Sequence, residues 1–182
     1  MTTSTLQPTT AQALDGLAAA VRGAIADHRD WSATAADVAA ALREHRPTAS
    51  VLTPAQRAGS DERYTAHRLH IEPDGSFSIV AMVWRPGQET RIHDHVTWCV
   101  FGTLAGEPVE DLYTLNDAED ALIAGGRQPC PAGTVSGDAP PGDIHRILNP
   151  SEETAVTLHV YGTDVSRIGT SLRRIYDLPI VA

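Results

Sequence analysis

The stretch Gly87–Gly106, GQETRIHDHVTWCVFGTLAG, decides the fold of this chain and carries its densest chemistry. It reads as a strand, a turn and a second strand with the pattern G-x5-H-x-H-x3-C-x6-G. Because side chains on a strand alternate between its faces, we expect His93, His95 and Cys99 on one side. An H-x-H pair alone is a weak metal signal, since two histidines often share a strand face by chance. Its meaning depends on what the rest of the chain supplies.

A second stretch, Pro140–Asn149 (PPGDIHRILN), supplies another histidine in a P-x-G-x2-H-x3-N frame. The Pro-x-Gly turn fixes where the next strand begins, and we expect it to place His145 facing the first pair. Three neutral imidazoles suit Fe(II), Zn(II), Ni(II), Cu(II) or Mn(II), and affinity alone does not choose among these metals. The two frames together predict one metal site built from His93, His95 and His145.

Length and composition narrow the class of protein. The 182 residues are enough for one domain with a full core and too few for two comfortable ones. A net charge of −9, with Lys and Arg together numbering 14, argues against a nucleic-acid partner. Two cysteines and no basic-then-apolar N-terminal run predict a cytoplasmic protein without a disulfide framework. No apolar run approaches the ~18 residues of a membrane span, and no obligate protein partner is evident.

The N-terminal part predicts a tail and two helices. Residues 1–10 are small and polar, so we expect a disordered tail. From residue 11 to 28, apolar residues recur every three or four positions, which predicts an amphipathic helix. A second helix is expected over residues 35–44, with Thr34 and Asp37 spaced as a capping box. Because these helices hold no convergent polar set, we expect them to cover one face of a sheet.

From Arg63 onward, short β-type runs separated by turn residues are typical of an all-β sandwich or barrel. A Pro-Asp-Gly turn at residues 73–75 predicts a hairpin, and VEDLYTL and TAVTLHVYG predict further strands. We expect a loop over residues 118–126, and either a helix or a strand within residues 164–177. Arg91 and Asp94 are expected at the surface, at the ends of the histidine strand.

The two histidine motifs together resemble the cupin superfamily, small β-barrels that bind one metal ion in the barrel mouth. The resemblance implies a mainly β fold, a double-stranded β-helix (jelly-roll barrel) with two N-terminal α-helices. Residues 11–182 would then form a single cupin domain, with a helical cover (11–46), a barrel (60–163) and a C-terminal segment (164–182). Most metal-binding cupins place a glutamate ligand in the first motif, and Cys99 stands in that slot here. Open metal positions without that carboxylate favour an anionic substrate such as a thiolate.

From Tyr64 onward the chain resembles the thiol dioxygenases of the cysteine dioxygenase type I family. Residues 157–161, Thr-Leu-His-Val-Tyr, are similar to the family's Ser-x-His-x-Tyr set. The resemblance gives Tyr161 the outer catalytic role, donating a hydrogen bond to the substrate or to bound oxygen while His159 orients it. By strand parity Thr157, His159 and Tyr161 face one way and can form one hydrogen-bonded chain. Tyr64 opens a strand, as a tyrosine does at the mouth of the family's pocket.

The expected substrate-binding residues are Tyr64, Arg68 and Cys99. In animal members of the family, a cysteine in this region is joined to the tyrosine of the Ser-x-His-x-Tyr set. A thioether between Cys99 and Tyr161 is the corresponding hypothesis here. Cysteine-specific members carry a Tyr-x-Arg pair whose guanidinium clamps the carboxylate, and this chain has Ala66 at that position. Arg68 lies two residues on, on the same face. Other arginines could take this role, namely Arg167, Arg173 and Arg174.

The resemblance therefore implies a non-haem Fe(II) thiol dioxygenase that adds both atoms of O2 to the sulfur of a small thiol or thione, giving a sulfinate. Without the arginine of the family pair, cysteine is not the expected substrate, and 3-mercaptopropionate, mercaptosuccinate and ergothioneine are open candidates. Two alternatives remain at this point. One is another metal-dependent cupin enzyme, either an isomerase or a dioxygenase of a carbon substrate. The other is a cupin that binds a ligand without catalysis.

Overall fold

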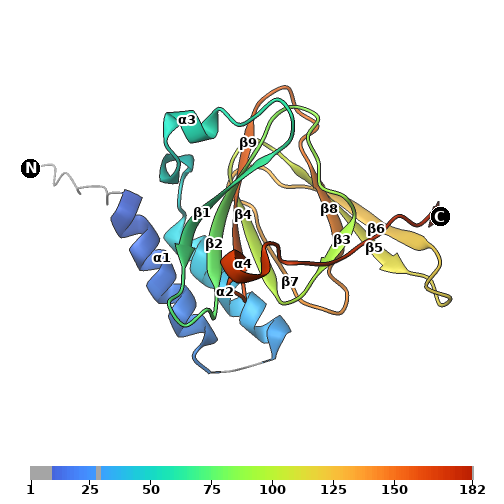
Figure 1. Cartoon of the computed structure of the whole chain (residues 1–182), viewed down its shortest axis with the longest axis horizontal. Helices are drawn as coiled ribbons and strands as arrows, with labels where there is room; N and C mark the ends of the chain where they lie inside the picture. Colours follow the sequence, from blue (N-terminus) through green and yellow to red (C-terminus); the bar gives the residue numbers. More distant parts are fainter. Residues whose placement is uncertain (1–9, 28–29, 182) are drawn as a thin grey trace, which may run out of the picture.

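The computed structural model describes residues 10–27 and 30–181, so the expected disordered tail lies almost wholly outside the described residues. Two curled β-sheets face each other, and two helices lie against the outside of one of them (Figure 1). This confirms the predicted mainly β architecture with two N-terminal helices. Within the described ranges, no helix is long and apolar enough to cross a membrane.

The strands divide between two sheets, antiparallel throughout except that the last strand runs parallel to its neighbour. The first sheet has the spatial order β1 (Thr65–Ile71), β2 (Ser78–Trp84), β9 (Ala155–Tyr161), β4 (Cys99–Ala105) and β7 (Val135–Asp138). The second sheet has the order β10 (Leu172–Ile175), β3 (His93–His95), β8 (Ile144–Leu148), β5 (Val109–Leu115), β6 (Leu122–Pro129) and β11 (Ile180–Val181).

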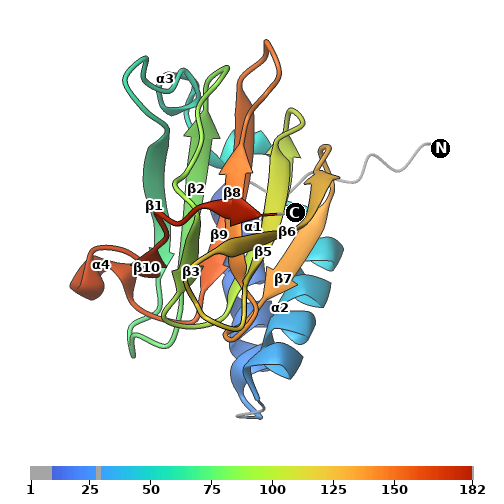
Figure 2. The same cartoon turned by 90° about the vertical axis from the view of Figure 1, so that its right-hand side faces the viewer.

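Two long helices, α1 (Thr10–Ile25) and α2 (Trp31–His45), cover the outer face of the first sheet (Figure 2). The apolar stripe expected on α1 is buried, with Leu17 fully inside the core. Helix α2 packs closely on β4 because Gly102 has no side chain. A Cβ added there would lie only 2.9 Å from a methyl carbon of Leu42. Shorter helical turns follow at η1 (Ala49–Val51), α3 (Pro54–Arg57) and α4 (Val165–Ile168).

Both faces of the first sheet are buried, and strand alternation separates their roles. On β2, residues 79, 81 and 83 belong to the core under the helices, as do residues 156, 158 and 160 of β9. The intervening residues of both strands therefore face the second sheet. On β9 these are Ala155, Thr157, His159 and Tyr161, all buried. The interior between the sheets is where polar and aromatic side chains converge.

Three local predictions are corrected by the structure. Helix α2 begins at Trp31, one turn earlier than predicted, because the Asp30 carboxylate caps it by accepting from the Ala33 N–H at 2.9 Å. The expected Thr34 and Asp37 capping box is therefore wrong. The expected loop over residues 118–126 is also wrong in its second half, since β6 begins at Leu122. A bulge opposite Leu112 breaks the alternation there.

Candidate metal centre

Three buried histidines meet in the interior between the sheets. His93 and His95 lie on β3, and His145 lies on β8, directly opposite His93 in the antiparallel register. Their ring centroids are 4.7 to 5.0 Å apart, and one potential ligand nitrogen from each lies within 4.8 Å of the others. No side chain of the three is more than 5% exposed. The structure brings together the three residues that the sequence motifs selected.

Each imidazole has one nitrogen held by an oxygen acceptor. The Nδ1 of His93 lies 2.8 Å from the carbonyl oxygen of Arg91. The Nδ1 of His95 lies 3.1 Å from a carboxylate oxygen of Asp143, and the Nδ1 of His145 lies 2.6 Å from Glu110. Such partners place the proton on Nδ1 and leave Nε2 for a metal, as in most histidine metal sites. The donor set therefore fits a divalent transition metal.

Two of the three ligand rings are neutral before a metal binds. Burial, together with the neighbouring histidines, lowers the pKa of His93 and of His145 to about 3. Neutral imidazole is the form that binds metals, so no proton has to leave these two rings near neutral pH. Burial also raises the pKa of Glu110 to about 7. Glu110, Asp138 and His145 form a second group that could bind a metal. In this group, however, the Nδ1 of His145 is already bonded to Glu110.

Glu110 and Asp143 are functional candidates that sequence reasoning missed. Glu110 is 1% exposed on β5, and Asp143 lies two residues before His145 in the second motif. Asp143 also accepts the backbone N–H of His95 at 2.8 Å, so it fixes both the ring and the strand of one ligand. The inward position of Glu110 in VEDLYTL was the available signal, but only the pairing of β5 with β8 reveals its partner.

Removing these carboxylates is expected to weaken metal binding without unfolding the protein. Glu110→Gln and Asp143→Asn should each lower Fe(II) affinity about 10- to 100-fold, because a neutral amide accepts less strongly and no longer orients the ring. Metal titration with a competing chelator measures this change. Asp111→Asn is the matched control, since Asp111 is the next residue on β5 and pairs with Arg127 and Arg146 instead. Equal metal affinity in the Glu110, Asp143 and Asp111 variants would contradict the assignment.

Cys99 faces the interior, but not by the route that the sequence suggested. The strand of the two histidines ends at His95, and Cys99 begins β4 in the opposite sheet. The prediction that Cys99 shares a strand face with the two histidines is therefore wrong. Cys99 is 4% exposed and lies beside Tyr161, its register partner on β9. Burial raises the pKa of the thiol well above its ordinary value.

Thr157, His159 and Tyr161 line one face of β9 toward the histidines. The Thr157 hydroxyl lies 2.9 Å from Nε2 of His159 and accepts the indole N–H of Trp84 at 2.8 Å. Burial lowers the pKa of His159 to about 3, so this ring is neutral. The His159 and Tyr161 rings stack with centroids 5.7 Å apart. The first link of the expected hydrogen-bonded chain, between Thr157 and His159, is therefore present. The second contact, between His159 and Tyr161, is a ring stack.

A C-terminal strap, residues 169–176, closes one side of the site. Asp94, expected at the surface, is only 2% exposed because β10 of the strap pairs with β3. Its carboxylate accepts the backbone N–H and guanidinium of Arg174 at 2.7 and 2.9 Å, and the hydroxyl of Tyr176 at 2.9 Å. In Figure 1 the dark red C-terminal segment runs from α4 toward the second sheet. The strap thereby holds the strand that carries two of the histidines.

The same strap reaches the phenol of Tyr161. Burial raises the pKa of Tyr161 well above its ordinary value, and a hydrogen bond with Ser171 acts in the opposite direction. The phenol therefore stays protonated near neutral pH and can donate a hydrogen bond. Its ring centroid is 6.1 Å from that of His95. Among the ring contacts of the described residues, Tyr161 is the tyrosine whose ring lies nearest to the three histidines.

Two neighbouring cavities give access to the histidines. The inner chamber, about 50 Å³, is lined by all three histidines together with His159, Tyr161 and Tyr64, which stacks on Trp84 at 4.5 Å between ring centroids. The outer groove, about 380 Å³, is lined by Ala66, Arg68 and residues 169–171. Of the four candidate arginines, only Arg68 lines either cavity. Arg167 pairs with Asp164 and Arg174 with Asp94.

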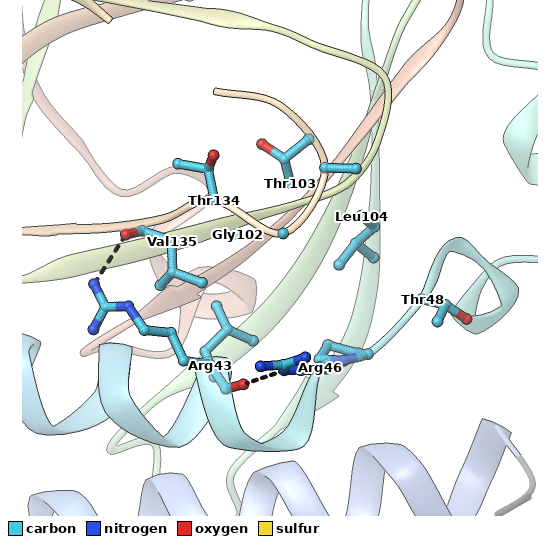
Figure 3. A pocket seen from close by; sticks show the side chains of 12 residues that line it. Arg43, Arg46, Thr48, Gly102, Thr103, Leu104, Thr134 and Val135 are labelled. Carbon is cyan, nitrogen blue, oxygen red and sulfur yellow. Dashed lines mark hydrogen bonds between the residues drawn. The ribbon is translucent and has the colours of Figure 1, made fainter. Parts of the chain in front are cut away.

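A larger cavity of about 620 Å³ lies on the other side of the first sheet, between the end of α2 and β4 and β7 (Figure 3). Its two arginines are occupied by backbone carbonyls, because Arg43 donates to Val135 at 3.0 Å and Arg46 to Arg43 at 3.2 Å. Within residues 10–27 and 30–181, its lining includes no histidine, cysteine or carboxylate. The chemistry therefore concentrates in the smaller chamber.

The fold and the three-histidine site together define a metal-binding cupin. The family model for cysteine dioxygenase type I matches residues 19–172, which is most of the chain. The chain belongs to the cysteine dioxygenase type I family. Membership indicates a dioxygenase, and the histidine cluster is its candidate metal site.

Solved cupin structures are similar over part of the chain. One is a cupin 2 conserved barrel domain protein from Salinispora arenicola, 26% identical with a TM-score of 0.46, covering 65% of this chain and 94% of that one. A second, from Desulfitobacterium hafniense, is 15% identical with a TM-score of 0.46 and covers 65% and 89%. A third, an rmlc-like cupin from Desulfovibrio desulfuricans, is 20% identical with a TM-score of 0.42 and covers 57% and 86%.

Proposed function

We propose that this protein is a non-haem Fe(II) thiol dioxygenase that converts a small thiol or thione to the sulfinate. The observation that carries the proposal is a metal face of three histidines without a carboxylate ligand, beside Cys99 and Tyr161. The acidic residue nearest to His145, Glu110, meets its Nδ1 and so supports the ring from behind. Family membership supports dioxygenase chemistry at this face. We place the enzyme in the cytoplasm, where small thiols are kept reduced.

Iron bound by Nε2 of His93, His95 and His145 would supply open positions at which a thiolate and dioxygen meet, together with the redox steps between them. The chain holds three imidazoles in fixed orientations through Arg91, Asp143 and Glu110. This preorganised face lets the sulfur and dioxygen come together without rearrangement of the protein.

The overall reaction balances without an external reductant. A thiolate, R–S⁻, and O2 give R–SO2⁻, with two sulfur–oxygen bonds formed and the oxygen–oxygen bond broken. Sulfur supplies the four electrons that reduce dioxygen, and the thiol proton leaves to solvent. The residues of the chain are therefore not consumed. Their task is to bind the sulfur, position the oxygen and exclude competing water.

Tyr161 is the residue placed to act on the oxygen or sulfur. Its phenol is protonated, buried and close to the ring of His95, so it can donate a hydrogen bond to the reacting atoms. The neutral His159 ring packs against it, and Thr157 and Trp84 fix that imidazole through their contacts. These contacts hold Thr157, His159 and Tyr161 in place, so their polar groups are oriented before the reaction begins.

Oxygen consumption by the Fe(II)-loaded protein tests the proposal. The protein is loaded anaerobically and mixed with cysteine, 3-mercaptopropionate, mercaptosuccinate or ergothioneine, and oxygen uptake is followed. Uptake that requires one thiol and ceases when it is exhausted supports a thiol dioxygenase. If iron is bound stoichiometrically and none of the thiols drives uptake, another metal-dependent cupin enzyme becomes the better account. Stabilisation by a ligand without turnover would instead favour a binding protein.

A thioether between Cys99 and Tyr161 is expected to form during turnover. The two residues face each other in the β4–β9 register and belong to one buried cluster. Joining sulfur to a ring carbon breaks one S–H and one C–H bond and forms one S–C bond. The two protons and two electrons released reduce one O2 to H2O2. Intact mass after aerobic turnover should fall by two hydrogens, with one peptide linking both residues. The mass of the Cys99→Ser variant should be the same before and after turnover. If the mass of the wild type is also the same before and after turnover, the cross-link does not form.

A further inference from the structure

We propose that the substrate is a mercaptocarboxylate longer than cysteine and without an amine, whose sulfur enters the inner chamber while its carboxylate meets Arg68 in the outer groove. This inference rests on the proposed thiol dioxygenase function and specifies its substrate class. It follows from the sizes of the two cavities, from the residues that join them and from where the cation lies.

The inner chamber is too small for a whole amino acid. Its volume is about 50 Å³, and on a comparable measure a cavity of about 10 to 15 Å³ holds one water molecule, so the chamber takes only a few small atoms. This space suits a sulfur atom and a small diatomic molecule. The lining contains neither arginine nor carboxylate, and its remaining polar groups are histidines, hydroxyls and an indole. A carboxylate placed there would meet no cationic side chain, whereas the outer groove offers Arg68.

The inner chamber continues into the outer groove. The two cavities share five lining residues, which form the boundary between them: Tyr64, Met82, Tyr161, Thr170 and Ser171. We infer that the ligand crosses this boundary. Two of the five are aromatic and one is a methionine, four carry a hydroxyl, and none is charged. An alkyl chain fits such an uncharged boundary, and its polar end then reaches the groove of about 380 Å³.

Arg68 is the cation that meets this polar end. It is exposed, and β1 alternation puts it on the same face as Tyr64 and Ala66. In the part of the chain that the structure describes, Arg68 makes no hydrogen bond or ion pair with another residue. Its guanidinium is therefore available for a bidentate bond to a carboxylate. Ala66 provides the space where the family's closer arginine would stand.

The groove offers nothing for an ammonium group. Among the residues that the structure describes, no aspartate or glutamate lines the inner chamber or the outer groove. An amine on the substrate would lose its hydration without gaining a charged partner, so binding should favour thiols that lack it. Cysteine thus has two defects in this site. On this proposal its carboxylate, only two carbons from the sulfur, stays short of Arg68, and its amine has no acceptor of opposite charge among the lining residues.

The test uses a series of thiols of increasing length on the full-length Fe(II)-loaded protein. The acids are 3-mercaptopropanoate, 4-mercaptobutanoate and 6-mercaptohexanoate. Homocysteine adds an amine to the second, and 6-mercaptohexanol removes the charge of the third. Anaerobic titration calorimetry gives Kd, and oxygen uptake gives kcat/KM. We expect both to improve at least tenfold from the shortest acid to a longer one, and to worsen for homocysteine and the alcohol.

Variants of Arg68 connect this preference to its residue. Arg68→Ala should weaken binding of the best acid about 10- to 100-fold and leave the alcohol unchanged, because only the acid loses a charged hydrogen bond. Arg68→Lys should restore part of the affinity. Arg173→Ala is the matched control, since Arg173 is exposed and lines neither cavity. It should behave like the wild type.

The outcomes separate the two proposals. If the shortest acid is the best substrate and Arg68→Ala does not change its kinetics, this inference is wrong while thiol dioxygenation stands. If long acids bind through Arg68 but none is oxidised, the binding site is supported and the proposed reaction fails. Weaker binding in Arg173→Ala but not in Arg68→Ala would assign the carboxylate to the strap and overturn the inference.

Discussion

His145→Ala should leave the protein folded and unable to hold iron. His145 is the one ligand from β8 and lies opposite His93 in the β3–β8 pairing, so its loss removes a third of the donor set. Fe(II) affinity should fall by more than about 100-fold, the upper range for residues that merely support a ligand. Oxygen uptake should fall with it. Metal content after desalting and chelator competition measure the effect.

The matched control is His67→Ala. His67 lies on β1, bonds to Thr65 at 3.3 Å and lines neither of the two cavities at the site. This variant should keep wild-type metal affinity and turnover. A circular dichroism melt of both variants shows whether folding is retained. If His145→Ala is folded and still binds one iron with wild-type affinity, the metal centre is not where we place it.

Tyr161→Phe should separate catalysis from metal binding. The substitution keeps the ring that packs on His159 and removes only the hydroxyl, which we propose donates a hydrogen bond to the reacting atoms. Iron content should be unchanged, while kcat should fall about 100- to 1000-fold, the usual effect of losing one preorganised donor. Consumption of oxygen without matching sulfinate should also rise, because oxygen is no longer directed to sulfur.

Tyr113→Phe provides the same chemical change elsewhere. Tyr113 is 6% exposed on β5 and lines neither the inner chamber nor the outer groove. Its removal should leave kcat and the ratio of oxygen to product unchanged. Equal kinetics in the Tyr161 and Tyr113 variants would support another metal-dependent cupin activity, in which the phenol has no special role.

The histidine cluster was predictable from the sequence because two short frames determine it. In GQETRIHDHVTW the alternation of a strand puts His93 and His95 on one face. The Pro-x-Gly turn before His145 fixes the start of the facing strand. Such information is local, so a single sequence carries it. The buried stripe of α1 was predictable for the same reason, since its period lies within one helix.

The residues around that cluster depend on contacts that no local pattern records. Asp94 reads as a surface residue in an alternating strand, and only the pairing of β10 with β3 covers it. Glu110 and Asp143 become supports of the histidines because β5, β8 and the turn before β8 meet in space. A buried carboxylate looks like a solvated one until its partner is known.

Cys99 shows how a correct expectation can rest on a wrong element. Strand parity predicted an inward thiol, but the chain leaves β3 after His95 and enters the opposite sheet at Cys99. The choice among arginines was also beyond the sequence, because Arg167 and Arg174 are occupied by nearby carboxylates that only the fold identifies. The thiol substrate, the bound metal and the cross-link stay predictions.

The most direct measurement is the isotopic mass of the product formed under labelled dioxygen. The Fe(II)-loaded protein is given its best thiol in an atmosphere of ¹⁸O2, and the product is analysed by mass spectrometry. We predict a sulfinate that carries two ¹⁸O atoms, formed in equal amount to the oxygen consumed. A product with one labelled atom, or a disulfide with none, would contradict thiol dioxygenation as the function of this site.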